Sequence, residues 1–307
     1  MGAFVGIDVS KATLDVAVAG DIASVQFANN PAGHRKLARW LLEKMPSRVF
    51  LEATGGYEQA VLDFLHNAGL PMTRVNPRQA RDFAKAIGQL AKTDRLDAHV
   101  LARMAAAMEL VRYEPREAWR ARLSGWNSRR NQLVQMLLSE RQRLDRFEEA
   151  SLRKCVQRHI AGLERELREV DREIASQMKA QPSIAPLASL RGAGPVLQAT
   201  LACELPELGR LDGKAIAKLV GVAPLARDSG QWSGHRSTWG GRGQVRRALY
   251  MSALTAMRFE PCLRDFYRRL RLAGKPSKIA IVAVMRKMLV ILNARMRDSL
   301  GSAQISY

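Results

Sequence analysis

Residues 117–180 constrain the fold of this 307-residue chain most, because they contain no proline and only two glycines. Apolar residues recur in this segment at alternating steps of four and three, a spacing that places them along one side of a helix. The clearest run comprises Val156, Ile160, Leu163, Leu167, Val170 and Ile174. A second, less complete run comprises Leu133, Leu137, Leu144 and Phe147. The runs fall out of register near residues 148–155, which predicts two long helices in a coiled-coil arm or helical hairpin; one helix packed on its own domain is the alternative.

Before this segment, the sequence alternates between strand and helix patterns. Short apolar or alternating runs predict strands at residues 3–8, 13–18, 22–27, 48–52 and 71–75. Helical spacing begins at Pro31 and returns at residues 56–68, 77–87 and 93–108. Three strands followed by helix, strand, helix, strand and further helices predict an α/β domain with a mixed sheet.

Behind the long helices, residues 181–186 have the composition of a linker. The remainder is mostly helical, with a glycine-rich loop at residues 230–243 and an apolar helix at residues 279–292. We therefore predict three domains: an α/β domain at 1–112, a coiled-coil arm at 113–182 and a mainly α domain at 183–307.

The formal net charge of +20 and the pI near 10.7 predict a polyanionic partner. Residues 1–110 hold 13 Lys and Arg against 11 Asp and Glu, a net of +2, whereas residues 227–307 hold 16 against 4, a net of +12. No run approaches the roughly 18 apolar residues of a membrane span. Nucleic acid is therefore favoured over a membrane, and a cytoplasmic location is expected. The three cysteines are far apart, which argues against disulfides and a structural zinc site.

Four carboxylates stand where rigid backbone would hold them. Asp8 and Glu52 each close an apolar strand, and Asp94 and Asp97 lie three residues apart at a helix start, on one face. Carboxylate oxygens are hard ligands that suit one or two Mg²⁺ ions, and paired metals roughly 3.5–4 Å apart clamp a phosphate during in-line displacement. Taken singly, each also fits a structural role, as a helix cap, a surface ion pair or a turn former.

Several segments resemble motifs of the DEDD-type insertion-sequence transposases, a family that includes Piv-type DNA invertases and bridge-RNA-guided serine recombinases. These are GIDVSK at 6–11, EATGGY at 52–57, VNP at 75–77, KTDRLDA at 92–98, GVAP at 221–224 and RRALYM at 246–251. The resemblance spans nearly the whole chain. It implies a RuvC-like, ribonuclease-H-type first domain in which Asp8, Glu52, Asp94 and Asp97 bind Mg²⁺, as two ions for which Mn²⁺ can substitute. It also implies a DNA recombinase or transposase of an insertion sequence that cleaves and exchanges strands through a phosphoserine intermediate.

The serine nucleophile that the resemblance implies falls on Ser229. A serine hydroxyl is a weak nucleophile that needs a base, a metal or charge stabilisation of the phosphate, and Arg227, His235 and Arg236 are near in sequence. Ser233, which also precedes a glycine, is the rival. The chain departs from the family in the loop that follows, where residues 239–241 read Trp-Gly-Gly in place of the more usual stretch with Ser and Lys. This departure affects the loop contacts more than the nucleophile.

Basic and glycine-rich segments of the second half predict nucleic-acid contacts. Residues 190–195 resemble a helix-hairpin-helix turn whose N–H groups meet a phosphate, and a plain helix connector fits them equally well. Arginines interleaved with Trp232 and Trp239 suit phosphate contacts with base stacking, and a solvated basic face is the alternative. The predicted contact residues are Arg191, Gly192, Gly194, Arg227, Arg236, Arg242, Arg246 and Arg247.

The expected partners are donor and target DNA, a structured guide RNA and further copies of the chain. The resemblance implies the guide RNA, and the lack of an evident recognition helix is consistent with it. The coiled-coil pattern predicts a homodimer or tetramer. A ribonuclease-H-like nuclease or junction resolvase, using the same carboxylates without a covalent intermediate, is the main alternative. A sugar-kinase or actin-like ATPase is disfavoured, because residues 9–11 lack a glycine-rich phosphate turn.

Overall fold

The computed structural model divides into two compact units, Met1–Arg116 and Glu117–Tyr307. The backbone is described for residues 2–89, 94–224, 228–229, 232–233 and 238–304, and the side chains of 94–96, 228–229, 232–233 and 302–304 lie outside this description. Among the helices of these ranges, none combines the length and apolar character needed to span a bilayer.

The first unit is built on a five-stranded sheet in the order β3-β2-β1-β4-β5. The strands are β1 (Phe4–Val9), β2 (Thr13–Val18), β3 (Ser24–Ala28), β4 (Arg48–Glu52) and β5 (Met72–Val75). β1 and β2 are antiparallel, as are β2 and β3, whereas β1, β4 and β5 are parallel to one another. The sheet is therefore mixed, as predicted. The third strand begins two residues later than expected, because Ile22 stands in the preceding turn and is 99% exposed.

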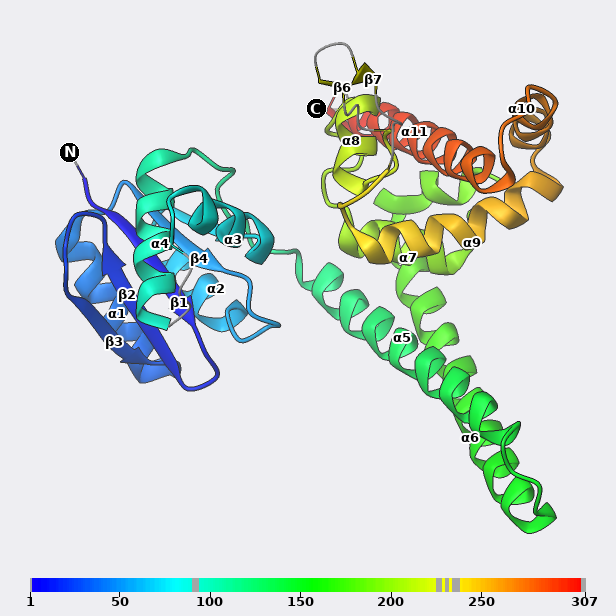
Figure 1. Ribbon diagram of the computed structural model, residues 1–307, viewed down its shortest axis with the longest axis horizontal. Helices are drawn as coiled ribbons and strands as arrows, with labels where there is room; N and C mark the ends of the chain where they lie inside the picture. Colours follow the sequence, from blue (N-terminus) through cyan, green and yellow to red (C-terminus); the bar gives the residue numbers. More distant parts are fainter. Residues whose placement is uncertain (1, 90–93, 225–227, 230–231, 234–237, 305–307) are drawn as a thin grey trace. The chain divides into compact units, whose positions relative to one another are not determined.

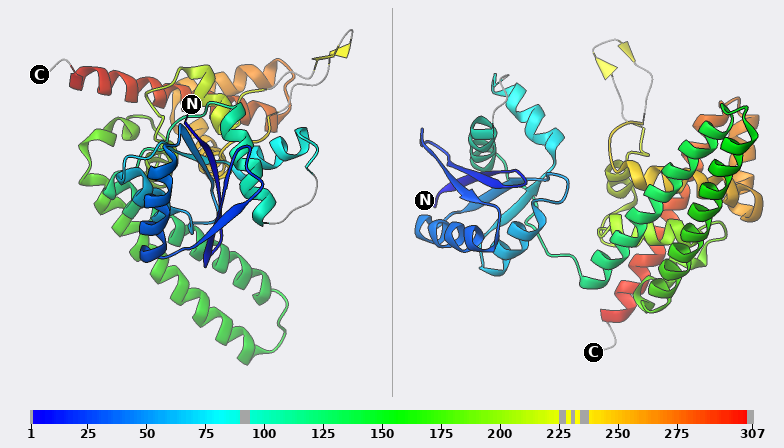
Figure 2. Two further views of the ribbon diagram at one scale, coloured as in Figure 1. Left: turned by 90° about the vertical axis from the view of Figure 1, so that its left-hand side faces the viewer. Right: turned by 90° about the horizontal axis from the view of Figure 1, so that it is seen from below.

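Helices cover both faces of this sheet (Figures 1 and 2). Alternating residues of β1, such as Val5 and Ile7, pack with α1 (Pro31–Lys44) and α2 (Gln59–Asn67) on one face. The opposite face carries α3 (Pro77–Ala86) and α4 (Asp94–Ala107), which pack on Phe50 of β4 and Ala17 of β2. The unit is thus a three-layer α/β/α sandwich.

Gly6 lets α4 lie directly on the central strand. A Cβ atom at Gly6 would stand 2.2 Å from the carbonyl oxygen of Ala98 and 2.3 Å from the amide nitrogen of Ala102. No side chain fits in that gap, so glycine at this position sets the distance between β1 and α4. Asp8, two residues along the same strand, faces the same side of the sheet as Gly6.

We expect Gly6→Ala to lower the free energy of unfolding by about 3 kcal/mol, because the added methyl group forces backbone apart in a packed core. Gly125→Ala is the control: Gly125 lies exposed within a helix with no atom within 4 Å of an added Cβ, and alanine there is expected to stabilise by up to about 1 kcal/mol. Chemical denaturation followed by circular dichroism measures both. Equal stability of the two variants would contradict the close approach of α4.

The two long helices of the second unit confirm the predicted helical hairpin. α5 (Ala118–Leu144) and α6 (Ala150–Lys179) pack side by side along the predicted apolar seam, where Leu133, Leu163 and Val170 are buried. Ion pairs flank the seam, with Arg130 Nε 2.7 Å from Asp171 Oδ1. Figure 1 shows this hairpin in green.

The remaining elements of the second unit form a helical domain around α11. They are η1 (Pro182–Ser189), α7 (Pro195–Glu204), α8 (Gly213–Val220), α9 (Gly243–Phe259), α10 (Pro261–Leu272) and α11 (Ser277–Gln304), with short strands β6 (Asp228–Ser229) and β7 (Trp232–Ser233). The predicted apolar helix at 279–292 forms the middle of α11, where Val284, Met288 and Leu292 are fully buried. The predicted linker at 181–186 is wrong, because this segment forms most of a 3-10 helix that buries Ile184 in the core.

Candidate functional site

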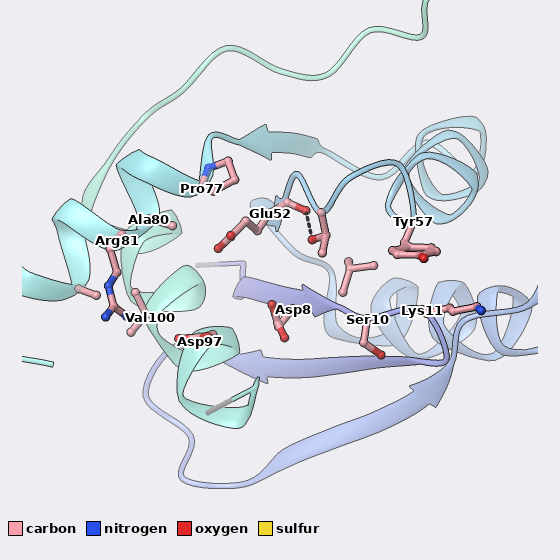
Figure 3. A pocket seen from close by; sticks show the side chains of 13 residues that line it. Asp8, Ser10, Lys11, Glu52, Tyr57, Pro77, Ala80, Arg81, Asp97 and Val100 are labelled. Carbon is pink, nitrogen blue, oxygen red and sulfur yellow. Dashed lines mark hydrogen bonds between the residues drawn. The ribbon is translucent and has the colours of Figure 1, made fainter. Parts of the chain in front are cut away.

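Asp8, Glu52 and Asp97 line one cavity of about 620 Å³ in the first unit. They come from β1, β4 and α4, and their side chains converge on the cavity in Figure 3. The parallel strands β1 and β4 end at the same edge of the sheet, where side chains of an α/β sheet commonly bind ligands. The close packing of α4 at Gly6 brings Asp97 to the same place.

Two cations line the same cavity and were not predicted as site residues. Lys11 and Arg81 lie at opposite ends of it in Figure 3. Lys11 ends the GIDVSK motif and lies two residues past the end of β1, so the sequence could have identified it as a site residue. Arg81 lies on α3, and its place at the cavity depends on how that helix packs, which the sequence pattern does not specify. Together they supply positive charge beside the carboxylates.

The turn after Glu52 is held by a buried carboxylate. Glu58 is 4% exposed, and its Oε2 accepts hydrogen bonds from the amides of Thr54 at 3.1 Å and Gly56 at 2.8 Å. Thr54 Oγ1 donates to the carbonyl oxygen of Glu52 at 3.1 Å. Gly55 and Gly56 both have positive φ, which explains the paired glycines of this motif. The segment that follows the Glu52 strand is therefore rigid.

The donor set fits Mg²⁺ in chemistry, since all three cavity-lining acids offer hard carboxylate oxygens. Within the described part of the chain, no three His, Cys, Asp or Glu side chains stand close enough to enclose one ion. Asp94, the fourth predicted ligand, begins α4 one turn before Asp97, and its side chain lies outside the described residues. The arrangement is an open carboxylate edge that faces a cavity large enough for a phosphodiester.

Ser229 lies in the second unit, on the two-residue strand β6, which pairs antiparallel with β7. Its side chain and that of Ser233 are outside the described residues. The backbone approaches itself closely at the two ends of the segment that carries Ser229, near residues 221 and 240. A Cβ atom at Gly241 would stand 2.4 Å from the carbonyl carbon of Val220, and one at Gly221 would stand 2.4 Å from the carbonyl oxygen of Gly240. Of the two glycines in the departure from the family pattern, Gly241 thus has a packing reason, whereas Gly240 has open space around it and a φ of +71°, which favours glycine.

The predicted nucleic-acid contacts occupy different environments. Arg191 and Arg247 are exposed. Arg242 is half-buried and makes a two-pronged ion pair with Glu207, at 2.6 Å and 2.5 Å, so its donors are engaged within the protein. Arg246 donates to the Val220 carbonyl oxygen at 3.3 Å and lines a further cavity. Arg227 and Arg236 lie outside the described residues.

The turn at residues 190–195 has a packing role as well as an exposed edge. Gly192 has φ +93°, and a Cβ atom there would stand 2.6 Å from the Cα of Ala256 on α9. Glycine is therefore required at position 192 by the packing of this turn against α9. Gly194 caps the start of α7 and has open space around it.

Comparison with known proteins places the chain in a family. A family model described as a transposase matches residues 5–147, and a model of the transposase IS116/IS110/IS902 family matches residues 185–268. The chain belongs to this transposase family. The first match covers the α/β unit and continues through α5 into the second unit. The second match lies wholly in the second unit, where it covers α7 to α9 and most of α10.

Known relatives agree with this assignment. The pilin gene-inverting protein of Moraxella bovis is 27% identical over 312 residues, which cover 96% of each chain, and that of Moraxella lacunata is equally similar. The insertion element IS116 uncharacterized 44.8 kDa protein of Streptomyces clavuligerus is 32% identical over 142 residues, 45% of this transposase and 35% of the relative.

Proposed function

We propose that this transposase is a Mg²⁺-dependent DNA recombinase whose RuvC-like first domain binds the metal through Asp8, Glu52, Asp94 and Asp97. The observation that carries the proposal is the convergence of Asp8, Glu52 and Asp97 on one cavity with two cations at its ends. A sheet edge with three acids and two bases suits a phosphodiester better than a neutral substrate. The names of the full-length relatives, which describe inversion of a pilin gene, support DNA as the substrate.

The residues of the first unit have separable roles in this account. Asp8, Glu52, Asp94 and Asp97 would hold the metal, for which Mn²⁺ can substitute, and bound metal supplies charge neutralisation and polarises a phosphoryl oxygen. Lys11 and Arg81 contact the neighbouring phosphates of the strand. The buried Glu58 keeps the turn after Glu52 in one conformation.

Ser229 is proposed as the nucleophile. Its Oγ forms a bond to phosphorus, the bond between phosphorus and the deoxyribose oxygen of the departing strand breaks, and the hydroxyl proton ends on that oxygen. A free strand end then attacks the phosphoserine and restores the serine. This exchange conserves the phosphodiester energy, as a recombinase needs when it rejoins strands without a nucleotide cofactor.

A guide RNA and self-association complete the proposal. The net charge of +20 exceeds what a short DNA contact requires, which supports a second nucleic acid. On the α5–α6 hairpin, Met136, Leu138 and Leu152 are 40%, 50% and 45% exposed. Large apolar side chains on an exposed helical arm support a homodimer or tetramer in which they are covered.

The test is an incubation of the protein with Mg²⁺, with any RNA that copurifies with it, and with DNA that carries the two ends of the insertion sequence. Rejoined recombinant strands are expected. Cleaved strands that accumulate with free ends and never rejoin would favour the nuclease or junction resolvase.

We expect Arg247→Ala to weaken DNA binding and to reduce the slope of log affinity against log salt by about 1, because the exposed guanidinium is available to a phosphate. Arg242→Ala is the matched control, since Glu207 already occupies that guanidinium; its effect is expected on the melting temperature and not on the salt slope. Fluorescence anisotropy between about 50 and 200 mM salt measures the slopes. A flat salt response of the unsubstituted protein would contradict phosphate binding altogether.

A further inference from the structure

We propose that Asn29 is a positioning residue that sets the spacing between Asp8 and Glu52, and with it the affinity of the site for a divalent cation. The inference rests on the proposed metal site. Asn29 follows β3 and lies outside every motif that points to the site. Its side chain joins the two segments that continue from the strands carrying Asp8 and Glu52.

The side-chain amide of Asn29 donates to two backbone carbonyl oxygens. Nδ2 lies 2.8 Å from the oxygen of Ser10 and 3.2 Å from the oxygen of Tyr57. Ser10 stands two residues after Asp8, and Tyr57 stands five residues after Glu52. Both residues line the cavity and lie at the same end of it in Figure 3. One NH₂ group thus bridges the β1–β2 turn and the β4–α2 segment.

His34 fixes the direction of that amide. The Nε2 atom of His34 lies 2.8 Å from Asn29 Oδ1. Carbonyl oxygens only accept hydrogen bonds, so Nδ2 must face Ser10 and Tyr57 and Oδ1 must face the ring, which requires a hydrogen on Nε2. His34 is 4% exposed, and burial lowers its pKa, so the neutral ring persists to lower pH than in water. Both charge states of His34 keep a hydrogen on Nε2. The bridge that Asn29 makes between Ser10 and Tyr57, here called the Asn29 clamp, therefore does not depend on the titration of His34.

The backbone of Asn29 is fixed from two sides. Its amide donates to the Ala12 carbonyl oxygen at 2.8 Å, which ties it to the β1–β2 turn. Next to it, Gly33 lies so close to the end of β3 that a Cβ atom there would stand 1.9 Å from the Ala28 oxygen. The start of α1 is therefore pressed against β3, and Asn29 has little freedom to follow a moving loop.

The clamp acts where the sheet no longer holds the two strands together. The paired register of β1 and β4 runs from Phe4–Arg48 to Ile7–Leu51, one residue short of both acids. Beyond that point β1 turns back into β2, while β4 leads into the turn held by Glu58. Like charges at Asp8 and Glu52 favour separation of the segments, so a bridge just past them maintains the geometry that a cation requires.

Asn29→Asp and Asn30→Asp form a matched pair that tests the inference. Each adds one negative charge, at adjacent positions. Asn30 caps α1 by accepting a hydrogen bond from the Gly33 amide at 2.9 Å, and an aspartate accepts it equally well. In Asn29→Asp, by contrast, a carboxylate oxygen replaces Nδ2 and faces two carbonyl oxygens without a hydrogen.

The measurement is the binding of Mn²⁺ alone to the full chain without DNA, with free Mn²⁺ followed by electron paramagnetic resonance. Asn29→Asp is expected to raise the dissociation constant about tenfold, the range seen when a residue supporting a metal ligand is changed. Asn30→Asp is expected to stay within about twofold of the unsubstituted protein. Added negative charge by itself would tighten binding, so unchanged or tighter binding by Asn29→Asp overturns the inference. Loss of thermal stability without loss of Mn²⁺ affinity, measured well below the melting temperature, overturns it too.

Two further variants separate the possible failures. Asn29→Ala removes both donors without adding charge, and it is expected to weaken Mn²⁺ binding in the same direction if Asn29→Asp does not fold. Asp8→Ala tests the metal site itself. If Asp8→Ala binds Mn²⁺ as tightly as the unsubstituted protein, the proposed metal site fails; if only the Asn29 variants bind normally, the clamp alone fails.

Discussion

Asp8→Ala is expected to lower the rate of DNA strand cleavage by at least about 10³-fold, while DNA affinity stays within about threefold. The loss corresponds to about 4 kcal/mol of transition-state stabilisation, the scale of metal assistance to a phosphoryl group. Asp8 stands on the central strand of the sheet, and the acid directly opposite it on β2, Asp15, already accepts hydrogen bonds from Gln26 at 3.1 Å and 3.3 Å, so we expect no compensation from that residue. Affinity is retained because the excess positive charge lies elsewhere, in residues 227–307.

Asp21→Ala is the matched control for this prediction. Asp21 is an exposed acid in the turn between β2 and β3 of the same unit, so its loss changes the net charge equally without touching the cavity. Cleavage is measured on radiolabelled DNA with Mg²⁺, with Mn²⁺ and with excess EDTA. Full activity of Asp8→Ala, or full activity in EDTA, would contradict a metal site at this edge of the sheet.

Ser229→Ala is expected to abolish the covalent protein–DNA adduct, with at least about a 10³-fold loss of strand exchange, because an alanine has no oxygen to bond to phosphorus. The folded state is expected to survive, since the substitution removes one oxygen atom from a residue of the two-residue strand β6. The adduct is measured as protein that migrates with labelled DNA after denaturation.

Ser233→Ala distinguishes the two serines of this loop. The two residues occupy the paired strands β6 and β7, so the substitutions are equal in chemistry and similar in position. Ser233→Ala is expected to keep the adduct. Loss of the adduct in Ser233→Ala alone would move the nucleophile to Ser233, and cleavage that persists in both variants without any adduct would identify a nuclease.

The regular elements of this fold were predictable because each has a periodic sequence. The seam of α6 at Leu163, Val170 and Ile174 repeats over several turns, and the five strands are short apolar runs bounded by turn residues. The carboxylates were predictable for a related reason. Asp8 and Glu52 each end an apolar strand, and these two strands are parallel neighbours in the sheet, so both acids stand at one edge.

Contacts that depend on how elements pack were not predictable. Arg242 had the appearance of a phosphate ligand in a basic stretch, yet Glu207, 35 residues earlier, occupies its guanidinium. Gly6 and Gly192 carry no periodic signal that identifies the helix each one contacts. In the sequence, Asn29 has the character of an ordinary turn residue. Its hydrogen bonds to Ser10 and Tyr57 exist only because the segments that follow β1, β3 and β4 meet at one end of the cavity. Local patterns specify elements, whereas the site depends on nonlocal contacts between them.

Anomalous diffraction from crystals of the full chain soaked in Mn²⁺ tests the metal site most directly. We expect an anomalous peak within about 2.5 Å of carboxylate oxygens of Asp8 and Glu52, with Asp97 or Asp94 beside it. In crystals of Asp8→Ala the same peak should vanish. A Mn²⁺ peak that lies elsewhere, or no peak at this sheet edge in the unsubstituted protein, would contradict the account.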